Sequence, residues 1–153
     1  MLSLFFGGIA LAKPTAIFLV RHAEKATGGD AKDPDLSEAG RARAASLAAI
    51  LKDTQLTAIY ATEFKRTQQT AKPLADAAHL EVTTVHAKET SDLVATLQQA
   101  NGNVLIVGHS NTLPEIIKAL GVASPPVIED AEYDNVFLLL PGTPVQLLRL
   151  HFR

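Results

Sequence analysis

Ile17-Phe18-Leu19-Val20-Arg21-His22-Ala23-Glu24 is a short apolar run followed at once by three ionisable side chains. The apolar part, rich in β-branched and aromatic residues, predicts a buried strand over 15–20. Arginine offers a planar fork of N–H donors that suits a phosphate group, and histidine is a nucleophile that works near neutral pH. The stretch therefore indicates a point where phosphate is held and attacked.

Strand and helix patterns alternate along the rest of the chain. Further strands are expected over 57–61, 80–85 and 104–107, and a C-terminal hairpin over 136–140 and 145–150. Helices are expected after the caps Ser37 and Ser91 and over 67–78 and 112–120. This alternation predicts an α/β fold, a three-layer α/β/α sandwich with a mainly parallel sheet.

Length, charge and cysteine content narrow the function classes. The chain has 153 residues, which fits one domain, and a formal net charge of -2. Without a basic stripe, it is not expected to bind nucleic acid. It has no cysteine, which excludes disulfides, cysteine nucleophiles and cysteine-based zinc sites.

Residues 1–12 are expected to stand apart from a domain over 13–153. They are apolar and end in Ala10-Leu11-Ala12, which resembles the apolar region and cleavage site of a secretory signal. This predicts an exported protein, periplasmic or secreted, although a basic start is missing. The alternative is an apolar segment packed on the domain. Neither this segment nor any other is long enough to span a bilayer as a helix.

Four residues are the candidate catalytic group: Arg21, His22, Arg66 and His109. Ligands of parallel α/β sheets bind beyond the carboxyl ends of the strands, and three of the four follow predicted strands. Two guanidinium groups can clamp a phosphate dianion, His22 can attack phosphorus, and His109 can donate to a phosphoryl oxygen. Asn111 is a candidate phosphate ligand, because it lies at a helix start, where free N–H groups favour anions.

Each of these residues also has an ordinary interpretation. A lone arginine after a strand is commonly a surface charge, and a lone histidine is more often structural than catalytic. Tyr133 precedes a predicted strand and either lines the rim of the pocket or belongs to a turn. The remaining histidines, which no motif places, are interpreted as surface or structural residues: His79, His86 and His151.

Several segments resemble, in order, the signatures of the histidine phosphatase superfamily, whose fold is phosphoglycerate-mutase-like. Arg21-His22-Ala23 resembles its Arg-His-Gly signature, with alanine where glycine is usual. The other matching segments are 35–40, 60–71 and 107–111. The alanine should be tolerated if its φ is negative.

The resemblance implies roles for the candidate residues. His22 would be the phosphorylated nucleophile, Arg21 and Arg66 the phosphate ligands, and His109 the second histidine of the pocket. It implies a metal-independent phosphatase without a cofactor. The substrate would be a phosphorylated small molecule or a phosphohistidine protein, and the oligomeric state stays open.

No motif in the sequence identifies the proton donor for the leaving group. An alcohol or sugar leaving group needs a proton as the P–O bond breaks. In many relatives an acidic residue after the third strand supplies it, and Glu89 is nearest to that place; Glu24 and Asp134 are weaker candidates. Without an acid, the expected substrates are those with easy leaving groups, such as phosphohistidine.

Three other functions compete with a phosphatase. A metal-dependent hydrolase is one, because His22-Ala23-Glu24 is similar to the start of a zinc deaminase motif, but the cysteine pair of that motif is absent. A non-catalytic phosphate-binding module of the same fold is the second. The third is a phosphomutase, which is disfavoured because the chain lacks long insertions to enclose a sugar phosphate.

Overall fold

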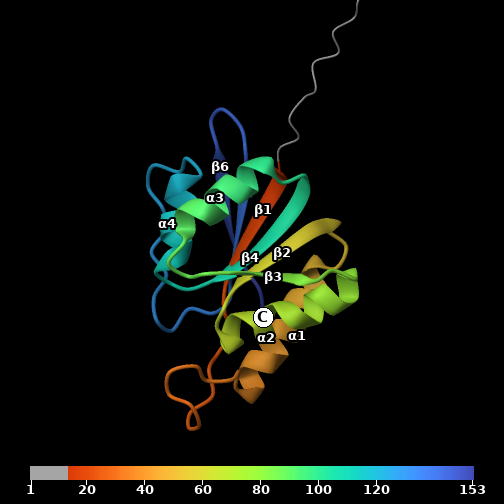
Figure 1. The fold of residues 1–153 in the computed structure, drawn as a ribbon, viewed down its shortest axis with the longest axis vertical. Coiled ribbons are helices and arrows are strands. Elements are labelled where there is room, and N and C mark those ends of the chain that lie inside the picture. The colour runs from red at the N-terminus through yellow and green to blue at the C-terminus, as the bar shows by residue number, and fades with distance from the viewer. Residues whose placement is uncertain (1–13) are drawn as a thin grey trace, which may run out of the picture.

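Six strands form one sheet in the order β3-β2-β4-β1-β5-β6 in the computed structural model, which describes residues 14–153 (Figure 1). The strands are β1 (Pro14–Arg21), β2 (Leu56–Thr62), β3 (Val82–Val85), β4 (Gly102–Gly108), β5 (Asn135–Leu140) and β6 (Gln146–His151). The apolar run at 17–20 lies in β1, a central strand that pairs with β4 on one side and β5 on the other. A strand buried on both faces explains why that run is continuously apolar.

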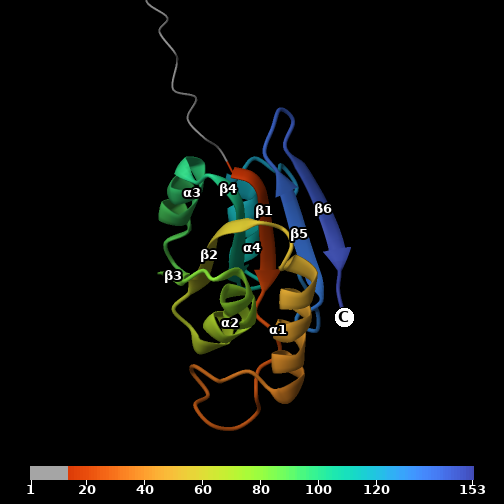
Figure 2. The ribbon, with the colours of Figure 1, turned by 90° about the vertical axis from the view of Figure 1, so that its right-hand side faces the viewer.

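Four helices cover the two faces of the sheet: α1 (Glu38–Leu51), α2 (Lys65–Ala78), α3 (Thr90–Gln99) and α4 (Thr112–Ala119). Apolar residues of α1 and α2, such as Leu47 and Leu74, pack against one face. Those of α3 and α4, such as Leu97 and Ile117, pack against the other. Figures 1 and 2 show the two helix pairs on opposite sides of the strands. The predicted three-layer sandwich is confirmed.

The sheet is mixed, which refines the prediction of a mainly parallel one. Strands β3, β2, β4 and β1 run parallel, whereas β5 pairs antiparallel with both β1 and β6. The predicted C-terminal hairpin is confirmed, since the short connection between β5 and β6 permits only an antiparallel return.

The segment after β1 is held close to α1. Ser37 is the N-cap of α1, and its side chain accepts a hydrogen bond from Gly40 N at 3.0 Å. Gly40 lies against the backbone of Glu24, where a Cβ atom would come within 2.2 Å of the Glu24 carbonyl oxygen. Ala23 is not among the described residues with positive φ, as expected for an alanine that replaces a glycine.

The predicted signal segment over 1–12 lies outside the described residues, so its expected export and cleavage stay predictions. Over 14–153, none of the helices combines the length and the apolar character needed to cross a membrane.

Candidate active site

The ends of three neighbouring strands bring the candidate residues together. Arg21, at the end of β1, is in register with Gly108 at the end of β4, and His22 N donates to the Gly108 carbonyl oxygen at 2.9 Å. His109 follows directly, so the two histidines lie side by side with ring centroids 5.3 Å apart. Strand β2 pairs with β4 on its other side and leads through Thr62 into Arg66. Figure 2 shows the loop between β1 and α1 projecting beyond this end of the sheet.

His22 is buried, and its hydrogen bonding fixes where its proton lies. Its Nδ1 is 2.8 Å from the carbonyl oxygen of Ala23. A carbonyl can only accept, so Nδ1 carries the hydrogen and donates it. The other ring nitrogen, Nε2, is then the one with a free lone pair. Burial lowers the pKa of His22 from 6.5 to about 3, with smaller contributions from nearby positive charge. The ring is therefore neutral, as a nucleophile must be.

His109 is buried against β2. Its Nε2 is 2.9 Å from the hydroxyl oxygen of Thr62, and its ring meets that of Phe64 edge-on with centroids 5.4 Å apart. Burial, followed by the charge of Arg66, lowers the pKa of His109 from 6.5 to about 4. Both histidines are thus neutral at pH 7 before an anion enters.

Arg21 is shared between the site and the segment before β5. The two hydrogens of its Nη1 are shared among three carbonyl oxygens, each 3.0 Å from Nη1: those of Glu129, Asp130 and Glu132. Its guanidinium carbon lies 4.1 Å from the centre of the Tyr133 ring, a cation–π contact. The Nε atom is buried and has no hydrogen-bond partner among the described residues. Arg21 therefore binds the segment before β5 through Nη1 and, at 3.5 Å, through Nη2 to the Tyr133 hydroxyl, and it keeps Nε as an unsatisfied donor.

Arg66 has a similar unsatisfied donor. Its Nε is also buried without a partner in the part of the chain described, and its guanidinium carbon lies 4.3 Å above the Phe64 ring. Its Nη1 is 3.8 Å from the Asp33 carboxylate, which accepts a hydrogen bond from Lys65 N at the start of α2. A buried N–H without an acceptor is unfavourable unless a ligand supplies one. Two such arginines beside two neutral histidines suit a phosphate group.

Two further predicted site residues are exposed and make no side-chain bond to this group. Glu89 is the exposed N-cap of α3, and its side chain makes none of the hydrogen bonds or ion pairs found among residues 14–153. Asn111 is the exposed N-cap of α4 and makes no side-chain capping bond. The proposed cap Ser91 lies inside α3, which begins one residue earlier at Thr90.

The other acidic candidates are held by neighbouring groups. The Glu24 carboxylate binds Arg43 at 2.6–2.9 Å. Burial alone would raise the pKa of Glu24, but the bonds to Arg43 outweigh it and lower the pKa. Asp134 lies 3.2 Å from His151, where both side chains are partly exposed.

The structure adds residues that sequence reasoning did not place in the site. Tyr133 has its ring centroid 6.1 Å from that of His22 and lies under Arg21, which favours the pocket-rim interpretation over the turn. Thr62 contacts His109. Both residues lie in segments that the family resemblance covers, 60–71 and 107–111, but the contact between them was not predicted. Glu63 influences the charge state of His109, and its carboxylate accepts a bond from Ala87 N at 2.9 Å. The sequence signal that could have placed Glu63 near the site is its position directly after β2, a central strand.

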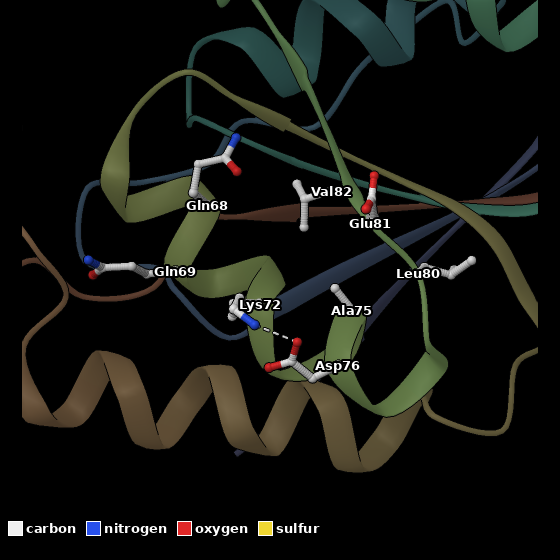
Figure 3. Close-up of a pocket in the computed structure, with 8 residues that line it drawn as sticks. All are labelled: Gln68, Gln69, Lys72, Ala75, Asp76, Leu80, Glu81 and Val82. Carbon is white, nitrogen blue, oxygen red and sulfur yellow. Dashed lines mark hydrogen bonds and ion pairs between the residues drawn. The ribbon is translucent and has the colours of Figure 1, made fainter.

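A separate groove of about 490 Å³ lies between α2 and β3 (Figure 3). It contains the ion pair between Lys72 and Asp76 and is lined by Gln68 and Glu81. None of the four candidate catalytic residues lines it, so it is separate from the candidate site. Over 14–153, no group of three or more His, Cys, Asp or Glu side chains is placed to hold a metal ion.

The structure is an α/β fold in which two histidines and two arginines gather at the carboxyl ends of neighbouring strands. The family model described as the histidine phosphatase superfamily (branch 1) matches residues 17–87. Over these residues, which are just under half of the chain, the sequence is similar to this superfamily. A phosphoserine phosphatase 1 from Hydrogenobacter thermophilus is 42% identical over 71 residues, which are 43% of this chain. The match covers only 34% of that relative, about a third of its length.

Solved structures share the fold. The protein histidine phosphatase SixA, solved with tungstate, has a TM-score of 0.70 and 16% identity, over 89% of this chain and 96% of that one. A mycobacterial glucosyl-3-phosphoglycerate phosphatase, solved with VO3, has a TM-score of 0.68 and 16% identity, over 88% and 97%. The phosphoglycerate-mutase-like α/β fold expected from the sequence is confirmed.

Proposed function

We propose that the protein is a phosphatase that forms a phosphohistidine intermediate on His22. One observation carries this proposal: the Nδ1–H of His22 is used by the Ala23 carbonyl at 2.8 Å, which leaves Nε2 as a free lone pair. The unsatisfied Nε donors of Arg21 and Arg66 provide for the phosphoryl oxygens. Relatives described as phosphoserine and protein histidine phosphatases support the same activity.

The reaction follows in two steps. The Nε2 lone pair of His22 forms a bond to phosphorus while the bond to the leaving group breaks, and the leaving group keeps that electron pair. Water then attacks phosphorus, the P–N bond breaks, and its electron pair returns to Nε2. Of the two water protons, one goes to the leaving group overall and one stays on the phosphate. The arginines offset the charge on the phosphoryl oxygens throughout.

We further propose substrates whose leaving group departs without a strong acid, such as phosphohistidine or an aryl phosphate. A carboxyl group that donates a proton at neutral pH needs a raised pKa. Hydrogen bonds lower the pKa of both Glu24 and Glu63, against the effect of burial. Glu89 is exposed, and its side chain makes no capping bond at the start of α3. A phosphohistidine protein or a small phosphorylated molecule of this type is the proposed partner.

The test uses p-nitrophenyl phosphate in excess chelator, with wild type, His22→Asn and a matched histidine control. His79→Asn removes an exposed imidazole at the left-handed C-cap of α2, and asparagine tolerates that conformation. We expect His22→Asn to lose activity at least 1,000-fold, on the order of a removed nucleophile, and His79→Asn to keep it. An acid-labile phosphoryl group should map to His22.

If the wild-type protein were inactive, the remaining interpretation would be a non-catalytic phosphate-binding module. Loss of activity in chelator alone would favour a metal-dependent hydrolase, and phosphoryl transfer between two positions of a substrate would favour a mutase. A comparison of phosphohistidine peptide, aryl phosphate and alkyl phosphate then tests the leaving group: the first two should turn over and the third should be poor.

We also propose export, with cleavage near Ala12. The apolar stretch ending in Ala10-Leu11-Ala12 supports this. Expression of the full chain in a bacterial host, fractionation and N-terminal sequencing of the recovered protein test it. Uncleaved protein confined to the cytoplasm would contradict export.

A further inference from the structure

A buried chain of hydroxyl groups stands behind His109. The His109 Nε2 is 2.9 Å from Thr62 Oγ1, which is 2.8 Å from Thr67 Oγ1. Thr67 Oγ1 lies 2.7 Å from the carbonyl oxygen of Phe64 and 2.9 Å from that of Thr62. All three side chains are buried, with Thr67 fully enclosed. Because the three side chains are buried, their own protons must account for these contacts.

The number of protons decides the direction of every bond. A hydroxyl has one hydrogen, and a carbonyl oxygen has none. The hydrogen of Thr67 must point to the two carbonyl oxygens, because otherwise they would face its lone pairs at 2.7 and 2.9 Å. The contact between Thr67 and Thr62 then needs the hydrogen of Thr62. With that hydrogen used, the contact between Thr62 and His109 needs a hydrogen on Nε2.

We infer that Thr62 and Thr67 are positioning residues that hold His109 as the Nε2–H tautomer and leave Nδ1 as its ligand-facing nitrogen. Nδ1 has no hydrogen-bond partner among the described residues. The two histidines are therefore held in opposite tautomers, His22 with its proton on Nδ1 and His109 with its proton on Nε2. The tautomer assignment does not depend on the proposed function, whereas its catalytic consequence rests on the proposed function.

The consequence concerns how His109 serves the phosphate. A neutral His109 offers only a lone pair at Nδ1, so it cannot donate there until it gains a second proton. A phosphate ester monoanion brings that proton: its O–H bond breaks, the oxygen keeps the electron pair, and Nδ1 forms the N–H bond. The productive complex thus holds one proton shared between a phosphoryl oxygen and Nδ1 of His109.

The charges around His109 agree with uptake of a proton from the substrate. Burial and positive neighbours lower the pKa of the free residue, and one carboxylate opposes them. The charged groups involved are Arg66, Arg21 and Lys25, which disfavour the proton, and Glu63, which favours it; the neighbouring ring of His22 is neutral. A bound phosphate offsets the arginines and so makes the second proton acceptable.

The direct test is ¹⁵N NMR of the full chain with labelled histidine, at neutral pH and without ligand. The nitrogen shifts distinguish an N–H from a bare ring nitrogen. We expect Nε2–H for His109 and Nδ1–H for His22, with assignment from His109→Asn and His22→Asn. A His109 signal with the proton on Nδ1 would overturn the inference. This measurement needs no activity, so it separates the inference from the proposed phosphatase function.

Two valine variants test the positioning roles, since valine keeps the shape of threonine without its hydroxyl. In Thr67→Val the hydrogen of Thr62 is free to point at His109 Nε2, so we expect the proton of His109 to move to Nδ1. In Thr62→Val the tautomer is no longer fixed. We expect kcat/KM for p-nitrophenyl phosphate to fall about 10- to 100-fold in Thr62→Val, because the charged His109 ring loses its hydrogen bond at Nε2.

Serine variants are the matched controls. Thr67→Ser and Thr62→Ser retain the hydroxyls and should keep both the wild-type tautomer and most of the activity. The wild-type kcat/KM should decline above the second pKa of the substrate phosphate, which is about 6 for a phosphomonoester, and Thr67→Val should weaken this dependence. An unchanged tautomer and an unchanged pH profile in Thr67→Val would contradict the roles of both threonines.

Discussion

The substitution Gly40→Ala should destabilise the protein, although glycine to alanine in a helix ordinarily stabilises. Alanine is favoured over glycine by about 1 kcal/mol within a helix. At Gly40, however, the new Cβ would lie 2.2 Å from the carbonyl oxygen of Glu24, which already accepts a hydrogen bond from Ser37 N. Ordinary contact requires roughly 1 Å more, so α1 or the segment after His22 must move.

The expected magnitude follows from these two opposing effects. Overpacking of this kind costs about 3 kcal/mol, and the propensity gain of about 1 kcal/mol offsets part of it. The net loss of about 2 kcal/mol corresponds to a fall in Tm of about 4–8 °C for a chain of this size. Because the displaced segment follows His22, kcat/KM should also fall, by up to about 100-fold for a shift of 1 Å.

Calorimetry and guanidinium unfolding measure the stability, and turnover of p-nitrophenyl phosphate measures the activity. The matched control is Ala45→Gly, on the exposed face of the same helix. It should cost only the propensity of about 1 kcal/mol and leave turnover unchanged. If Gly40→Ala instead raised Tm by the amount that Ala45→Gly lowers it, the close approach of α1 to Glu24 would be refuted.

Three further predictions concern ionisable groups. Burial lowers the pKa of His22 to about 3 and that of His109 to about 4, so between pH 6.5 and 4 only the unfolded chain takes up these two protons. The free energy of unfolding should therefore fall by about 2 kcal/mol per histidine when the pH is lowered from 7 to 5. Guanidinium titrations at the two pH values measure this fall, which should be smaller in His22→Asn. Arg43→Met should remove about 1 kcal/mol at pH 7 by leaving Glu24 without its partner; this loss should disappear as the pH falls through the lowered pKa of Glu24, whose ion pair stabilises only above it. Glu89→Gln should change kcat/KM for p-nitrophenyl phosphate by less than about twofold, whereas a loss of 100-fold or more would identify Glu89 as the general acid.

The meeting of His22 with His109 is predictable because it depends only on topology. Both residues follow apolar runs that form neighbouring parallel strands, and the carboxyl ends of such strands lie at one edge of the sheet. Because Arg21 is in register with Gly108, the residues that follow them, His22 and His109, have adjacent rings. Motifs at strand ends are therefore informative even when the strands are far apart in sequence.

The placement of Glu89 is not predictable in the same way, because it depends on where α3 begins. A start after Ser91 would leave Glu89 in a loop free to turn toward the histidines. The helix begins at Thr90, so Glu89 becomes its N-cap and is exposed. Helix boundaries shift by a residue or two between equally good capping sequences, so the sequence does not decide whether Glu89 lies in a loop or at the N-cap.

The second task of Arg21 shows a different limit. Its Nη1 binds the carbonyl oxygens of Glu129, Asp130 and Glu132, more than 100 residues away in sequence. Every residue has a backbone carbonyl, so no pattern of side chains in the segment before β5 reveals that it converges on a guanidinium group. Arginine can serve both partners because its donors point in several fixed directions. The residue that suggests phosphate binding in the sequence thus also fixes the loop that brings Tyr133 over the site, and a lysine at this position could do only one of the two.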